Sequence, residues 1–161
     1  MSGLDPAAIT AIYDSLLSHA RSLKLFETSA DHEPLNPPGG GLSFALMLGP
    51  LEPIREGGLA ATSGRLEFQA RIYYPAMARG GGDIDRKVMQ AAVTLLAAYS
   101  GDFNLLTGNI AAGLVRMVDL LGAHGQPLRG EPGWLLRDGA PFRVYDVLLP
   151  LILNDVFAQV A

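Results

Sequence analysis

The chain has 161 residues, contains no cysteine and carries a net charge of −4 at neutral pH. This length fits one domain spanning residues 1–161, the lack of cysteine excludes disulfides, thiolate metal sites and thiol nucleophiles, and the 12 scattered Lys and Arg residues argue against a nucleic-acid-binding surface. Hydrophobic residues make up 49% of the chain, which indicates either apolar surface left for a partner or simply an abundance of Ala and Leu.

The first predicted element is a helix from about Pro6 to Lys24. Asp5 can cap its free amide groups, and Pro6 suits the first helical position because its missing N–H would have no helical partner there. Apolar residues then recur at helical spacing, namely Ile9, Ile12, Leu16, Ala20 and Leu23. A short strand is expected around 26–28, and a Pro- and Gly-rich loop follows over about 29–41.

Two strands are predicted next, Leu42–Leu48 and Arg65–Tyr74, joined as a wide hairpin by a loop over about 51–63. The second strand alternates clearly, with one side formed by Leu66, Phe68, Ala70, Ile72 and Tyr74. Its other side is formed by Arg65, Glu67, Gln69, Arg71 and Tyr73. A strand with one apolar side must be covered, and the helices expected before and after it can do this.

A second helix is predicted to begin at Asp83 or Asp85 and to end near Gly101. Its apolar stripe consists of Val88, Ala91, Ala92, Leu95, Leu96 and Tyr99, and its small side chains allow close approach to a sheet. A further strand is expected over Leu114–Leu121, followed by a loop over about 122–133.

The last predicted feature is a hairpin of two strands, Trp134–Arg137 and Phe142–Leu149. They flank Asp138-Gly139, a dipeptide that favours the positive φ angles of a tight turn. Pro150 cannot donate a hydrogen bond, so we expect the last strand to end there or to continue only at a sheet edge. The order of elements predicts an α+β fold, with a mostly antiparallel sheet of four to five strands and two main helices packed on one face.

No motif indicates catalysis. His19, His32 and His124 are not spaced to place two metal ligands on one helix face. The runs Gly39–Gly41 and Gly80–Gly82 lack the spacing of a phosphate-binding loop and are typical of flexible loops, and no serine occupies a nucleophile-elbow motif. We therefore expect no enzyme activity, no cofactor and no metal.

Asp119 and Asp146 stand out because each interrupts an apolar strand. A charge in such a place must be paired or must face solvent. Arg116, Arg143 or an arginine of a neighbouring subunit is a candidate partner, and a plain exposed face is the alternative.

Two groups of residues are candidate contact sites. Arg65, Glu67, Gln69, Arg71 and Tyr73 mix both charge signs with an aromatic, which suits a subunit interface, although an ordinary solvated sheet face has the same composition. The loop over 51–63 is longer than a hairpin requires, so it is either a contact arm or a tolerated insertion.

Several segments occur in a suggestive order along most of the chain: DPAAITAIYDSLLSHARSLKLFE, GLAATSGRLEFQARIY, DIDRKVMQAAVTLLAAYSGDF, VDLLGAHGQPL and VYDVLLPLILND. In this order and at this length, the chain resembles a family of small proteins from tailed phages and prophages of actinobacteria. That family resembles the tail terminators. The glycine run at Gly80–Gly82 and the stretch Leu105–Gly113 depart from the pattern.

The resemblance implies a structural protein that forms a homo-oligomeric ring, commonly a hexamer. The ring caps the tail tube at the head-proximal end of the virion tail and joins it to the head, after assembly in the host cytoplasm. The implied partners are other copies of the chain, the tail tube protein and a head–tail connector protein. No membrane and no specific nucleic-acid binding are expected, although DNA can pass through the lumen.

We expect Pro53, Ile54, Arg55 and Glu56 to contact the tube or the connector. Two alternatives to the terminator remain open. One is another head–tail connector or neck protein with the same kind of subunit, and the other is a small-molecule-binding domain whose loops close over a ligand.

Overall fold

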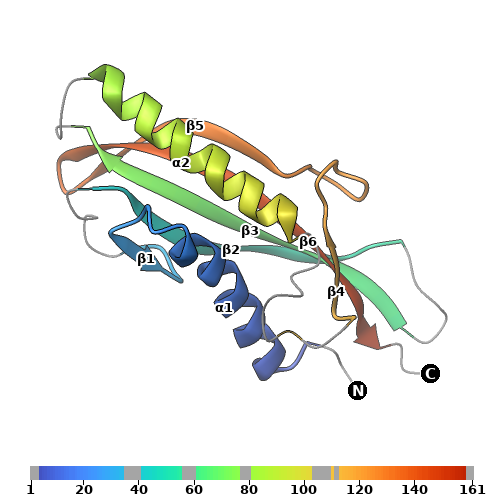
Figure 1. The fold of residues 1–161 in the computed structure, drawn as a ribbon. Coiled ribbons are helices and arrows are strands. Elements are labelled where there is room, and N and C mark those ends of the chain that lie inside the picture. Colours follow the sequence, from blue (N-terminus) through green and yellow to red (C-terminus); the bar gives the residue numbers. More distant parts are fainter. Residues whose placement is uncertain are drawn as a thin grey trace.

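Among the described residues, six strands form one sheet and two helices cover one of its faces (Figure 1). The computed structural model describes residues 4–34, 41–55, 61–76, 81–102, 110 and 113–158. In chain order, the elements are α1 (Pro6–Ser22), β1 (Thr28–Ala30), β2 (Ser43–Pro53), β3 (Ala61–Pro75), α2 (Gly81–Gly101), β4 (Val115–Val118), β5 (Arg129–Arg137) and β6 (Ala140–Ala158).

The sheet has the strand order β1-β2-β3-β6-β4, and β5 also pairs with β6. The two strands on that edge follow one another, since β5 pairs with residues 140–148 of β6 and β4 pairs with residues 151–153. Only β1 and β2 run parallel among the described pairs. The α+β prediction is confirmed, with six strands instead of four to five because the short strands β1 and β4 both join the sheet.

The main core lies between the two helices and the sheet. Figure 1 shows α2 along β3 and β6, while α1 lies beside it on the β1 and β2 side. The sheet contributes Phe44, Leu46, Leu66, Phe68, Ala70, Ile72, Val147, Leu149, Leu151 and Leu153, and the helices contribute Ile12, Leu16, Leu17, Ala20, Ala91, Ala92, Leu95 and Tyr99. The predicted stripes of both helices are therefore buried or half-buried, except for Ile9 of α1, which is exposed.

Local sequence signals explain where several elements begin and turn. The Ala8 N–H donates to the Asp5 carboxylate over 2.8 Å, so Asp5 caps α1 as predicted. The β5–β6 hairpin is also confirmed: Asp138 and Gly139 have φ angles of 48° and 78°, which are the positive values that its tight turn requires.

Two predicted loops are shorter than expected because the neighbouring strands continue into them. β2 extends to Pro53 through an irregularity between Leu48 and Leu51, after which Leu51 pairs with Leu66. At this irregularity Gly49 approaches β3 so closely that a Cβ atom would lie 2.5 Å from the Glu67 carbonyl oxygen. β3 begins at Ala61 and β5 at Arg129, so much of 51–63 and part of 122–133 are strand.

The prediction that the last strand ends at Pro150, or runs only at an edge, is wrong. β6 continues to Ala158 and lies between β3 and the β4 and β5 strands. The Pro150 carbonyl accepts from the Asp119 N–H over 2.9 Å, which places the proline nitrogen on the same side, since N and O of one strand residue face the same neighbour. On that side, the pairing with β5 extends along β6 only to Leu148, and the pairing with β4 starts at Leu151. Pro150, which lacks the N–H donor, therefore falls in the gap between these two partner strands.

Candidate functional site

The β3 side chains predicted to form an interface lie on the sheet face opposite the helices. They are Arg65, Glu67, Gln69, Arg71 and Tyr73, and they alternate with residues of the main core. Arg65 and Tyr73 are each only 1% exposed, whereas the other three are half-buried. Arg65 and Tyr73 therefore lie in the interior of this chain, which argues against direct contact with a neighbour. The interface role of the five residues stays a prediction.

Arg65 is buried by the segment between β4 and β5, which folds over this face. Its guanidinium donates to the Glu67 carboxylate and to the Gln126 backbone carbonyl. Its Nε atom lies 3.7 Å from the Asp119 carboxylate, which is also 1% exposed. Three oxygen groups therefore surround one buried cation, as a charge in this position requires.

Asp119 holds the covering segment in place. Its carboxylate accepts the backbone N–H groups of Ala123 and His124 over 2.7 Å and 3.0 Å. The segment passes so near the guanidinium that a Cβ atom at Gly125 would lie 2.7 Å from Arg65 Cζ. The same carboxylate thus pairs with the sheet and shapes the loop that covers it.

Tyr73 belongs to a second, smaller core on the same face. It packs with Ala45, Phe142 and Val144, and its ring meets that of Phe142 edge-on at 6.5 Å between centroids. An ion pair between Glu33, after β1, and Arg137, at the end of β5, joins opposite edges of the sheet. The sheet therefore curls around this core. Burial in the core raises the pKa of Tyr73, and the nearby positive charge of Arg71 opposes this increase.

The expected partners of the two strand carboxylates need correction. Asp146 pairs with Arg71, its cross-strand neighbour, through contacts of 2.5 Å and 3.1 Å. Asp119 pairs with Arg65. Cross-strand register decides the Arg71–Asp146 pair, because side chains on the same face of adjacent strands meet. Asp119 follows β4, which is not adjacent to β3, and it reaches Arg65 because the segment after β4 folds over this face.

The two arginines expected as those partners bind elsewhere. Arg116 donates to the Asn154 side chain over 2.7 Å, and Arg143 donates to Asp85 of α2 over 2.9 Å. Beside the Arg71–Asp146 pair, the curled face has a hollow of ≈ 300 Å³, lined by Gln69, Gln126, Arg129, Glu131, Asp146 and Leu148.

The residues predicted to contact the tube or connector lie at the end of β2. Pro53 and Arg55 are exposed, but Ile54 is 8% exposed and belongs to the interior. Ile54 therefore packs inside this chain, and Glu56 lies outside the described residues. The contact role of these residues stays a prediction.

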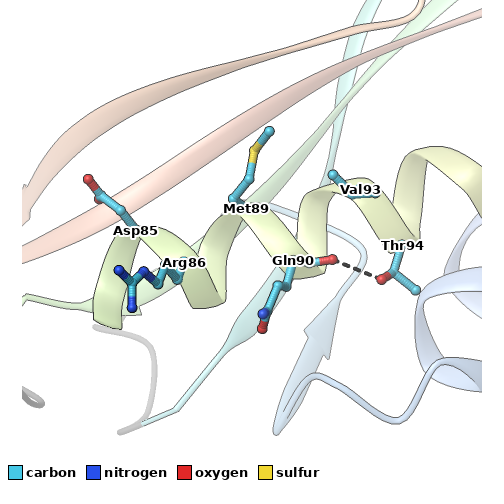
Figure 2. Close-up of a pocket in the computed structure, with 6 residues that line it drawn as sticks. All are labelled: Asp85, Arg86, Met89, Gln90, Val93 and Thr94. Atoms are coloured by element: carbon cyan, nitrogen blue, oxygen red, sulfur yellow. Dashed lines mark hydrogen bonds between the residues drawn. The ribbon is translucent and has the colours of Figure 1, made fainter. Parts of the chain in front are cut away.

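Sequence reasoning missed two apolar surfaces on the helix-bearing side. The first, here called the β5–α2 patch, is the set of exposed apolar side chains on two elements that Arg143 links, namely Trp134 and Leu136 of β5 and Met89 and Val93 of α2, exposed by 63%, 69%, 51% and 54%. Figure 2 shows Met89 and Val93 projecting from one side of α2, in line with Asp85. Asp85 binds Arg143, whose guanidinium lies 4.7 Å from the centre of the Trp134 ring.

The second surface, here called the α1–β2 groove, is a hollow of ≈ 240 Å³ between the start of α1, residues 48–51 of β2 and residues 66–68 of β3. Its lining is almost wholly apolar: Leu4, Ile9, Ile12, Tyr13, Leu48, Gly49, Leu51, Leu66 and Phe68. Leu48 is 69% exposed, and Ile9 and Leu51 are also exposed. The high apolar content was the only sequence signal for these surfaces.

The rings of two histidines lie close to carboxylates. His19 lies 2.9 Å from the Asp102 carboxylate, and the His32 ring lies 2.7 Å from Asp31. Within the described ranges no cluster of His, Asp and Glu is suited to a metal ion. The same ranges include no helix that combines the length and the apolar character needed to cross a membrane.

Comparison with known proteins identifies a shared fold. No protein-family model matches the chain, and no curated protein matches it. Among solved structures, it is similar to a chain in a structure of the virion of a native gene transfer agent (GTA) particle, with a TM-score of 0.51 and 14% sequence identity. The match covers 92% of this chain and 98% of the other. At this identity, the similarity shows the fold alone.

Proposed function

We propose that this chain is a structural protein of a phage-like virion and, more specifically, a tail terminator. In this role it forms a homo-oligomeric ring, commonly of six copies, that caps the tail tube at its head-proximal end and joins it to the head. Its partners are other copies of itself, the tail tube protein and a head–tail connector protein.

The observation that carries this proposal is the fold shared with a chain of a gene transfer agent virion. The two chains match over nearly their whole lengths, 92% of this one and 98% of the other. The sequence segments that resemble the actinophage family support the same role, because this resemblance does not depend on the fold.

The surface of the subunit is also compatible with ring formation. A closed ring of identical subunits requires two different surfaces on each copy, one meeting the other around the ring. The β5–α2 patch and the α1–β2 groove are two distinct exposed apolar surfaces, and exposed apolar patches of this kind are typical of protein contact sites.

A head–tail connector or neck protein at another ring position is the second candidate. The similar chain comes from a structure of a whole particle, so the shared fold supports either position. In both cases the ring encloses a passage for DNA, and a chain with a net charge of −4 gives little attraction to phosphates.

Co-sedimentation tests the proposed function and separates the two candidates. The purified chain is mixed with tail tubes assembled without it and, separately, with portal-bearing heads. A terminator pellets with the tubes, whereas a neck protein of the head pellets with the heads only. Binding to neither would overturn the proposal.

A further inference from the structure

We propose that neighbouring copies in the ring join through their sheet edges: β5 of one copy lies along the free side of β2 of the next, and its Trp134 and Leu136 side chains enter the α1–β2 groove. The inference rests on the proposed function in that a ring needs such a contact. It names the surface and the partner, a second copy of this chain.

Both strands have an unpaired side among the described residues. β1 pairs with β2 only at residues 43–45, so residues 46–53 have no described strand on the side away from β3. β5 pairs with β6 and with no other described strand. Unpaired edges expose backbone N–H and C=O groups that readily accept another strand, so each edge can complete the other.

The apolar side chains on the two edges also lie on the same face of the sheet. Leu48 and Leu51 pair with Phe68 and Leu66, which belong to the main core under the helices. Trp134 pairs across from Arg143, which reaches α2. Leu136 follows two residues later and therefore points to the same side.

A sheet that continues from one copy to the next keeps its faces aligned. The exposed leucines of β2 and the Trp134 and Leu136 side chains then become cross-strand neighbours, the arrangement in which apolar side chains stabilise strand pairing. A contact between two β5 edges, or between two β2 edges, would leave either the groove or the patch uncovered.

The exposed area of the β5–α2 patch and of the β5 edge fits this contact. Trp134 is 63% exposed and an aromatic side chain buries about 150–250 Å², so with three further half-exposed side chains the β5–α2 patch reaches the few hundred Å² typical of interaction sites. The edge of β5, nine residues and about 30 Å long, extends this area toward the roughly 800 Å² per partner of a specific interface.

The rims of the two surfaces differ in charge. Next to lining residues of the groove, Asp5, Asp14 and Glu52 are exposed. Beside Met89 on α2, Asp85 is paired with Arg143, and the exposed Arg86 and Lys87 outnumber the one other carboxylate of these turns, Asp83. An acidic rim opposite a more basic one favours contact between unlike surfaces over contact between like ones.

Disulfide trapping tests this contact, because the chain has no cysteine of its own. The variants are Leu48→Cys, Leu136→Cys and the double variant, all at side chains that are 69% exposed and can be changed without disturbing the core. Leu121→Cys, at a residue 94% exposed, replaces Leu48→Cys as the matched control.

After mild oxidation, a mixture of the two single variants should give cross-linked dimers, while each single variant alone and the pair with Leu121→Cys should give almost none. The double variant should give a ladder of covalent species that ends at the ring. Dimers from Leu136→Cys alone, or no dimers from the mixture, would overturn the inference.

A second variant separates this inference from the proposed function. Trp134→Asp combined with Leu136→Asp should keep the melting temperature of the subunit and reduce its solution mass from the ring to the monomer. A ring that survives this change would overturn the inference and leave the function standing. Cross-linked rings that bind neither tubes nor heads would support the contact and overturn the function.

Discussion

Arg65 lies on the sheet face opposite the helices, where the segment between β4 and β5 covers it. Its guanidinium is the positive group facing the buried Asp119 carboxylate. We predict that Arg65→Met lowers the free energy of unfolding by about 3–5 kcal/mol, because it leaves a buried charge without a partner. Urea denaturation measures this loss. The control is Arg71→Met on the same face, where the pair with Asp146 is partly exposed and the expected loss is about 1 kcal/mol. Equal losses would contradict the assigned role.

Tyr99 gives a second prediction for a single residue, this time through pH. Its buried hydroxyl donates to the Leu16 carbonyl of α1 over 3.1 Å, and burial raises its pKa above the ordinary 10.0. The unfolded chain ionises near that value while the folded chain keeps the proton. The stability contributed by this group is therefore complete below about pH 10 and is lost as the pH rises further.

We predict that Tyr99→Phe costs about 1 kcal/mol of unfolding free energy at neutral pH, where it removes one hydrogen bond. Between about pH 9 and pH 11 its stability should fall less steeply than that of the unmodified chain, because one raised pKa is gone. Urea denaturation at both pH values gives the comparison. Identical slopes would show that Tyr99 does not contribute to the alkaline loss.

For single residues, the sequence shows that a strand carboxylate has to be paired or exposed, but it does not show which residue pairs with it. Asp119 and Asp146 were each expected either to be paired or to face solvent, and both are paired. The partners were not predictable, because Arg65 and Arg71 meet them through the packing of segments that are far apart in the chain. The burial of Tyr73 was missed for a related reason, since it depends on the curl of the whole sheet.

Among the elements, the β5–β6 hairpin is the one whose turn is fixed most locally. Gly139 has a φ of 78°, in the left-handed region that side chains with a Cβ atom disfavour. We predict that Gly139→Ala costs about 1 kcal/mol, which corresponds to a fall in melting temperature of about 2–4 °C for a chain of this size. Gly101→Ala is the control: Gly101 is the last residue of α2, its φ is not left-handed and no atom lies near its Cβ position, so no fall is expected. A larger loss at Gly101 would contradict this account.

The elements predicted well from sequence are those defined by local patterns, namely both helices and the final hairpin. The lengths of β2 and β3 were underestimated because Gly49, Pro50 and Pro53 read as breaks, whereas pairing with β3 carries the strand through them. Pro150 also read as a break, although the strand continues past it. Its missing donor is tolerated only because β5 and β4 leave a gap at that position, and a gap between two partner strands cannot be read from one strand's sequence.

At the scale of the whole molecule, the two faces of the sheet differ in what they offer. The face opposite the helices is curled around its own small core and is partly covered by the segment after β4. The helix-bearing side leaves the β5–α2 patch and the α1–β2 groove exposed. Copies that join through the expected interface on β3 would therefore use the face opposite the helices, whereas copies that join through the patch and the groove would use the helix-bearing side.

The apolar composition predicted either surplus apolar surface or simply an abundance of Ala and Leu, and it could not locate such a surface. Leu48 and Trp134 lie in predicted strands, and only the structure shows that both side chains are exposed. The proposed ring depends on such exposed surfaces, so neither its contacts nor its size follows from sequence patterns.

The most direct test of the proposed ring is the solution mass of the purified chain, measured by light scattering over a concentration series. We predict one discrete mass that is a small multiple of the monomer, with six copies as the expected number, and that stays constant over a wide range of concentrations because a closed ring has no free surfaces left to bind further copies. A monomer mass at every concentration would contradict the account, and so would a mass that grows continuously with concentration.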